Sequence, residues 1–231
     1  MKYVHNNKFN KKLENMEDIL ENSNGVYLTD KDLFTKIWTS PRQVFKYIND
    51  KRYDKYVTIL LILSGISRCF DRASMNNMGD KMPISLILGL CIFIGGLFGW
   101  ISYYIYAALV CWTGKWLKGQ GDTSSILRIF AYAMIPSIIA LIFLVPQIGI
   151  YGVEIFKENG DLTSAGWVPN ILVYGSFILE VVLGIFTIIF CVVGISEVQK
   201  LSIGKSILNL VLPGIIILTP IVVIILIYKA F

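Results

Sequence analysis

Charged and catalytic side chains are scarce in this 231-residue sequence. Asp, Glu, Lys and Arg together make up 16% of the residues, against about a quarter in soluble domains. His5 is the only histidine, and it lies in a polar N-terminal stretch, outside every apolar segment. HExxH, GxSxG and phosphate-binding P-loop motifs are absent. These absences disfavour familiar metal-dependent and nucleophilic enzymes, and a composition with so few charges disfavours a nucleic-acid partner.

Cysteine chemistry is also limited. The four cysteines lie within or at the ends of apolar runs and show no CxxC spacing: Cys69, Cys91, Cys111 and Cys191. We expect them to be buried as small hydrophobic residues rather than to form disulfides or bind metal. The sequence therefore predicts no metal and no cofactor.

Apolar residues, in contrast, make up 55% of the chain, and the mean hydropathy is +0.64. A transmembrane helix needs about 20 mostly apolar residues, and five segments approach or exceed this length: 56–70, 84–112, 126–153, 170–196 and 206–229. The first segment is the shortest and contains Arg68 near its end. We therefore predict an all-α fold, a polytopic membrane bundle of five transmembrane helices.

The basic residues predict the orientation of this bundle. Eleven of the 21 Lys and Arg residues precede the first segment, and no apolar run lies within residues 1–30 to act as a secretory signal. With a cytoplasmic N-terminus, 16 basic residues lie inside and five outside, as the positive-inside rule requires. Five spans then predict a short C-terminal tail outside. The Asn, Ile and Lys bias indicates a bacterial source, and hence the bacterial cytoplasmic membrane.

The chain divides into three parts by composition. Residues 1–30 are polar and predict a flexible tail, residues 31–55 predict one or two amphipathic helices, and residues 56–231 form the five-span part. In the middle part the apolar side chains of Phe34, Trp38 and Phe45 are candidate interfacial anchors. They would lie on the inner membrane face, attracted by anionic lipids through nearby basic residues, or pack on the cytoplasmic ends of the spans. A helix that binds a partner protein is the alternative.

One ionisable residue lies deep in the fourth segment. Glu180 falls about 5 Å from its midpoint at 1.5 Å per residue, where a charge costs roughly 3 kcal/mol on insertion scales. We expect it to face the bundle interior with Ser176 on the same helix face, and to meet Tyr132 or Ser137 of the third segment. Tyrosines of the second segment are further candidate partners. Such a polar site serves either an ion, proton or polar substrate, or helix packing alone.

Two loops on the predicted inner side carry basic residues. Residues 114–125 join the second and third segments, and residues 194–206 join the fourth and fifth. Together with the amphipathic segment they predict a basic inner surface that contains Lys115, Lys118, Arg128, Lys200 and Lys205. Separately, Gly95 and Gly99 form a GxxxG pair that predicts close helix approach, within one chain or in a homo-oligomer.

The order of several short motifs resembles the Yip domain family, five-span proteins named after binding Ypt/Rab GTPases. The carriers lie within residues 33–229: Trp38, Ser40-Pro41 and Phe45; Gly114-Lys115, Gly119 and Gly121; Arg128, Ala131-Tyr132 and Ile135-Pro136; Gly194, Glu197-Val198, Ser202 and Gly204-Lys205. The spacing is most similar to the prokaryotic branch. The resemblance implies a cytosolic N-terminus, a short outer C-terminus and, from the eukaryotic branch, a role in membrane traffic or organisation through partner binding.

Three functional hypotheses follow. The first is a non-enzymatic adaptor or membrane-organising factor that uses the basic inner surface to contact anionic lipids and a protein partner. The second is a small transporter, channel or lipid-moving protein with a polar site around Glu180. The third is an intramembrane enzyme that uses Glu180.

Overall fold

A computed structural model describes residues 28–163 and 166–230 of the chain. Every regular secondary-structure element within these residues is a helix. The N-terminal part contains α2 (Asp30–Lys36) and α3 (Pro41–Asp50). The middle contains α4 (Val57–Met75), the short 3-10 helix η1 (Met78–Asp80), α5 (Ile84–Leu90), the π-helical turn η2 (Cys91–Gly95) and α6 (Gly96–Trp116). The remainder contains α7 (Thr123–Ala133), α8 (Ile135–Tyr151), the 3-10 helix η3 (Gly152–Phe156), α9 (Trp167–Gln199) and α10 (Ile203–Ala230). Residues 1–27 of the predicted N-terminal tail lie outside the described residues.

Local sequence explains several of these helix ends. Thr29 caps α2 in a capping box with Asp32, and α3 begins at Pro41 directly after Ser40, as the Ser-Pro pair predicts. The third apolar segment is broken at Met134, because Pro136 cannot continue the hydrogen bonds of the preceding turn.

The described residues contain four helical stretches long and apolar enough to cross a membrane, not the five predicted. They are Ile84–Trp116, Thr123–Phe156, Trp167–Gln199 and Ile203–Pro220. The first predicted span, 56–70, is wrong by this measure. Its helix α4 continues to Met75 and thereby includes Asp71 and Arg72 in addition to Arg68.

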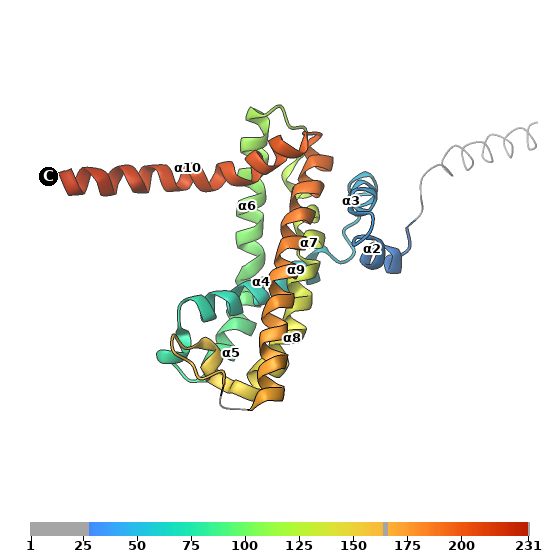
Figure 1. Cartoon of the computed structure of the whole chain (residues 1–231). Helices are drawn as coiled ribbons and strands as arrows, with labels where there is room; N and C mark the ends of the chain where they lie inside the picture. Colours follow the sequence, from blue (N-terminus) through green and yellow to red (C-terminus); the bar gives the residue numbers. More distant parts are fainter. Residues whose placement is uncertain (1–27, 164–165, 231) are drawn as a thin grey trace, which may run out of the picture.

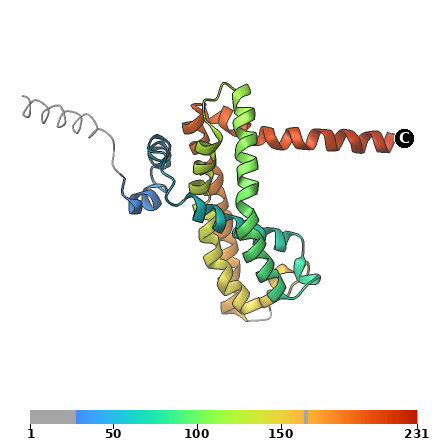
Figure 2. The same cartoon turned by 180° about the vertical axis from the view of Figure 1, so that it is seen from behind.

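The helix α4 nevertheless has a central position. It packs against α6, α7 and α8, and η1, which follows it, contacts η3 at the far end of the bundle. In Figures 1 and 2 α9 runs beside α7 and then α8, and α6 lies next to α7. The helix α4 passes across the bundle, and α10 leaves crosswise from the end where α9 finishes. The oblique path of α4 thus carries the chain from the side of α3 to the end that holds α5.

The crossing of α4 and α6 depends on three glycines. A Cβ atom on Gly65 would lie 2.4 Å from the carbonyl oxygen of Gly95 and 2.7 Å from the Cα of Gly99. Real Cβ atoms do not approach backbone this closely, so the two helices can touch only where both lack side chains. The predicted GxxxG pair therefore makes a contact within one chain.

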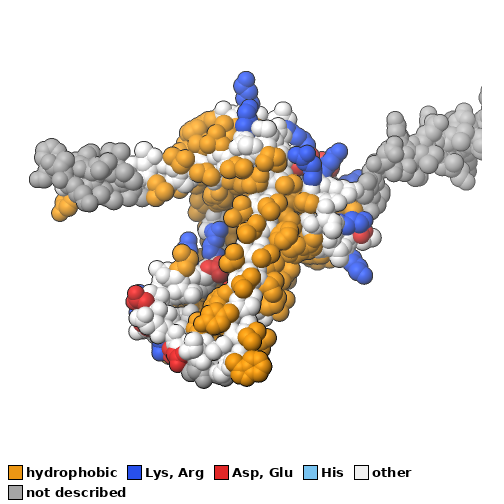
Figure 3. Space-filling model, in the orientation of Figure 1, with side chains coloured by type: hydrophobic (Ala, Val, Ile, Leu, Met, Phe, Trp, Pro, Cys, Tyr) orange, Lys and Arg blue, Asp and Glu red, His pale blue; other side chains and the backbone are white. Residues whose placement is uncertain are grey.

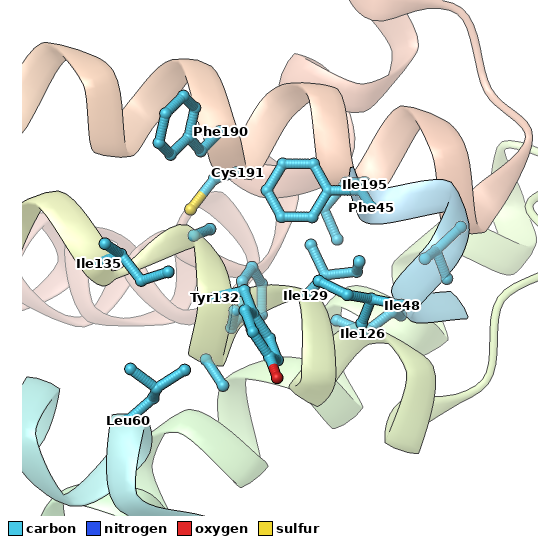
Figure 4. Close-up of a cluster of buried hydrophobic side chains, with 14 of the residues drawn as sticks. Phe45, Ile48, Leu60, Ile126, Ile129, Tyr132, Ile135, Phe190, Cys191 and Ile195 are labelled. Carbon is cyan, nitrogen blue, oxygen red and sulfur yellow. The ribbon is translucent and has the colours of Figure 1, made fainter. Parts of the chain in front are cut away.

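A buried apolar core lies between α3, α7 and α9. Phe45 and Ile48 of α3 lie against Ile129 of α7 and Ile195 of α9, and all four side chains are fully buried. Figure 4 shows them converging, with Tyr132 and Phe190 nearby. This core attaches the N-terminal helices to the bundle.

The outer surface, in contrast, is apolar over most of the long helices. Along α9, for example, Ile178 is 69% exposed and Val181 is 65% exposed, and apolar side chains cover much of the face in Figure 3. A protein in water rarely exposes so large an apolar area. The chain is therefore an integral, multi-pass membrane protein whose helices contact the lipid bilayer.

We predict that Gly99→Ala destabilises the protein by about 1–3 kcal/mol, as overpacking does in other cores. The new Cβ would lie 2.4 Å from the Cα of Gly65, and backbone atoms cannot move aside easily. Thermal unfolding in one mild detergent measures the effect. Gly175→Ala is the control, because its Cβ meets nothing within 4 Å. Equal midpoints for both variants would contradict the tight crossing.

Candidate functional site

One end of the bundle carries four exposed lysines. Lys115 and Lys118 lie at the end of α6 and in the loop after it, and Lys200 and Lys205 lie where α9 gives way to α10. We call these four residues the lysine surface. Figure 3 shows basic side chains at this end, above the base of α10. Lys118 and Lys200 have positive φ angles of 67° and 54°, so each stands at a sharp reversal of the chain.

The two loops of the lysine surface are joined by Gln199, whose side chain is fully buried. The backbone N–H of Gly121 donates to its Oε1 at 3.0 Å, and its Nε2 donates to the carbonyl of Val110 at 3.4 Å. The backbone N–H of Gln120 donates to the Gln199 carbonyl at 3.2 Å. A side chain at the end of α9 therefore holds the α6–α7 loop in a fixed position.

Glycines make room for this amide. A Cβ on Gly114 would lie 2.3 Å from Nε2 of Gln199, and one on Gly119 would lie 2.2 Å from its Oε1. A Cβ on Gly121 would meet Val198 at 2.7 Å. The Gly114, Gly119 and Gly121 pattern therefore forms a cradle for Gln199, which is a structural reason for the spacing.

A second buried amide fixes the start of α10. Asn209 is fully buried, and its Oδ1 accepts a 2.9 Å hydrogen bond from the hydroxyl of Thr113 in α6. The phenol of Tyr106 donates to the carbonyl of Leu210 at 2.6 Å. The base of α10 is thus attached to α6 even though its distal part leaves the bundle.

The helix α3 joins the lysine surface through Glu197. This carboxylate pairs with Lys200 at 2.8 Å and with Arg42 of α3 at 3.7 Å. Arg42 also donates to the hydroxyl of Ser196 at 3.4 Å. The basic side chains of α3 and of the lysine surface consequently belong to one continuous face.

Arg128, predicted on that face, is instead buried, with 6% of its surface exposed. Its Nε lies 2.8 Å from Oδ1 of Asp54, and its Nη1 donates to Ser125 at 3.4 Å. A charge buried this far needs a partner, and Asp54 supplies one from the linker that leads into α4. Arg128 therefore connects α7 to that linker and is not part of the lysine surface.

The three candidate anchors lie on the bundle. Phe45 is fully buried against Phe190, and Trp38 meets Phe186 and Phe190 edge-on at 5.5 and 5.6 Å between ring centroids. Phe34 contacts Tyr56 at 5.4 Å. The sequence left two arrangements open for these side chains: on the inner membrane face, or packed on the cytoplasmic ends of the spans. In the structure they pack on other helices of the bundle.

Asp30 holds α2 in place. It accepts hydrogen bonds from Lys55, Tyr53 and Tyr56, the last at 2.7 Å. These bonds, that from Lys55 first, hold the pKa of Asp30 well below its usual range. The carboxylate is thus ionised at neutral pH, as its contact with Lys55 requires. At the start of α7, a hydrogen bond with Ser125 similarly lowers the pKa of Asp122.

Glu180 lies at a cavity of about 460 Å³ between α4, α8 and α9. Gln147 donates to its Oε1 and to the hydroxyl of Ser176, both at 2.7 Å. Asp71 and Ser137 line the same cavity. The cavity therefore brings together two carboxylates, an amide and several hydroxyls inside an otherwise apolar bundle.

Of the two candidate partners from the third segment, only Ser137 reaches this cavity. Its hydroxyl lies 2.9 Å from that of Thr187. Tyr132 is fully buried elsewhere, with its ring 6.3 Å from that of Phe34 beside α2. The predicted Glu180–Tyr132 contact is wrong, and Gln147 takes its place.

Three amides that sequence reasoning did not select, Gln147, Gln199 and Asn209, turn out to make helix contacts. A neutral amide inside an apolar run is a weak but usable signal, because an amide needs partners there. No group of three His, Cys, Asp or Glu side chains among the described residues is arranged to hold a metal ion. All four cysteines are free, and three of them are buried.

A family model described as the Yip1 domain matches residues 35–225, which include α3 to α9 and most of α10. No curated protein and no solved structure matches the chain.

We predict that Gln199→Ala destabilises the protein by about 1–3 kcal/mol and loosens residues 114–125. The change leaves the Gly121 N–H without its acceptor and opens a space in the cradle. Thermal unfolding and limited proteolysis of the loop measure both effects. Gln120→Ala is the matched control, since the Gln120 side chain is exposed. The same cleavage rate in the Gln199→Ala and Gln120→Ala variants would contradict the role of Gln199 in holding the loop.

Proposed function

The chain belongs to the Yip1 domain family, and from this premise we propose that it is a non-enzymatic membrane adaptor that recruits a protein partner through the lysine surface. The family consists generally of non-enzymatic membrane proteins. The observation that carries the proposal is that two loops about 80 residues apart in sequence are held together by Gln199 with their four lysines exposed.

Rigid loops distinguish this surface from ordinary positive-inside loops. Basic residues that only set membrane orientation need no fixed geometry. Here the buried amide of Gln199, the Asn209–Thr113 bond and the Glu197 pairs restrict both loops at once. Preorganised charges bind a partner at a lower entropic cost than mobile ones, so the geometry favours recognition of an acidic partner surface.

The proposal includes a bacterial cytoplasmic membrane with the lysine surface and α2–α3 on the cytoplasmic side. Anionic inner-leaflet lipids would then meet the rim of the same surface. The outside location of the C-terminus stays a prediction, because α10 lies crosswise to α9 rather than beside it.

We expect reversal of the four lysines to Glu to abolish recruitment of the partner in crosslinking and mass spectrometry on native membranes. The four charges face outward, so a reversed surface would repel an acidic partner. The matched control replaces the same four lysines by Arg and should retain the same partner. Cysteine labelling from each side verifies that the orientation is unchanged. An identical set of crosslinked proteins in the wild-type and Glu variants would refute the adaptor.

A second candidate function is a transport site, favoured by the cavity at Glu180. The Gln147–Glu180–Ser176 cluster and Asp71 would hold a proton or a small cation among otherwise apolar helices. The transport and adaptor functions predict different effects of substituting Glu180, because only transport requires its carboxylate.

For this second function we expect Glu180→Gln to abolish proton or cation flux in proteoliposomes that contain the folded protein. Gln keeps the shape and can still bond to Gln147, but it cannot carry the charge. Asp50→Asn is a control that removes an exposed carboxylate outside the cavity, at the end of α3. A wild-type protein without measurable flux, or a Glu180→Gln variant with full flux, would leave the cluster with a role in helix packing only.

A further inference from the structure

A second hollow lies beside α4, and a single arginine faces it. This groove of about 350 Å³ is bordered by α4, α6, α7, α9 and α10. We call it the Arg68 groove. Its other walls are mainly apolar and aromatic and include Tyr103, Phe130, Ile188 and Val211. It is separate from both the lysine surface and the Glu180 cavity.

Arg68 forms no ion pair with a described carboxylate, although its charge acts on Asp71, three residues later in α4. Its guanidinium lies 4.4 Å from the ring centroid of Tyr103, a cation–π contact, and no ion pair or hydrogen bond joins it to a described side chain. Asp71 follows one turn later but lines the Glu180 cavity. A guanidinium that is half-buried and makes no direct ion pair is costly in an apolar bundle. A bound anion would remove that cost.

The groove opens toward the lipid rather than toward water. At its mouth Ile188 is 65% exposed and Val211 is 51% exposed, and both belong to candidate membrane spans. Figure 3 shows basic side chains in the recess below α10, beside apolar ones. An anion that enters by this route must carry an apolar tail.

The depth of Arg68 fits a lipid headgroup. α9 has 33 residues and is therefore about 50 Å long, against a hydrocarbon thickness of about 30 Å. Thr187 and Cys191, which line the groove, lie 12 and 8 residues before Gln199, or about 18 and 12 Å from the end of the helix. If α9 is centred, the groove spans about 2 to 8 Å below the headgroup boundary, a depth that an arginine side chain can bridge.

We infer that the Arg68 groove binds an anionic phospholipid of the leaflet that faces the lysine surface. Its phosphate pairs with Arg68, and one acyl chain lies along Ile188, Leu210 and Val211. The Tyr106 bond to the Leu210 carbonyl holds the wall on the α10 side. The inference is independent of the adaptor proposal, because it involves none of the four lysines.

The test uses native mass spectrometry of the full chain in mild detergent, titrated with phosphatidylglycerol or with phosphatidylcholine of the same chains. We expect one phosphatidylglycerol to bind at least tenfold more tightly than phosphatidylcholine, and excess inorganic phosphate not to displace it. Arg68→Gln should remove this preference. Arg72→Gln, an exposed arginine on the same helix, and the four-lysine Glu variant should both retain it.

Two further variants keep the test decisive if Arg68→Gln does not fold. Arg68→Lys retains the charge and should keep a weakened preference, whereas Val211→Trp fills the mouth and should reduce binding with Arg68 intact. Unchanged binding in Arg68→Gln and Val211→Trp would overturn the inference. Loss of the preference only in the four-lysine variant would assign the lipid to the lysine surface instead, and displacement by phosphate alone would indicate a site for a free anion.

Discussion

A polar group inside a lipid bilayer has no water to bond with, so it must find a partner in the protein or in a lipid. This constraint accounts for the contacts that join the helices of this chain. Gln199 reaches α6 from α9, Gln147 reaches α9 from α8, and Asn209 reaches α6 from α10. Apolar side chains give little selectivity here, because lipid is as apolar as they are. Amides, hydroxyls and the glycine crossing therefore decide which helices are neighbours.

Local properties made part of this fold predictable. Composition and the lengths of the apolar runs predict the helical membrane class, since both depend only on nearby residues. The same locality explains the error in the first span: the run ends at Phe70, but its helix continues to Met75 and takes in Asp71 and Arg72. A hydropathy pattern locates apolar residues and does not fix where a helix ends.

The candidate sites were less predictable because they depend on long-range contacts and on direction. The sequence indicates the depth of Tyr132 and Ser137, yet the two residues lie on different helices because the chain breaks at Met134. They consequently face different surroundings. Arg128 is basic and near the inner loops, but only its distant partner Asp54 explains why it is buried. The spacing of the glycines in the α6–α7 loop is explained only by the side chain of Gln199, about 80 residues away in the sequence.

The Glu180 cavity and the Arg68 groove lie back to back, and a pair of hydroxyls separates them. Ser137 lines the cavity, Thr187 lines the groove, and their oxygens lie 2.9 Å apart. The Thr187 hydroxyl is also placed to donate to the carbonyl of Leu183 at 3.0 Å, and either of the two hydroxyls can donate to the other. The two hollows of opposite charge therefore share one polar wall, and on α4 they meet again, because Arg68 of the groove acts electrostatically on Asp71 of the cavity three residues later.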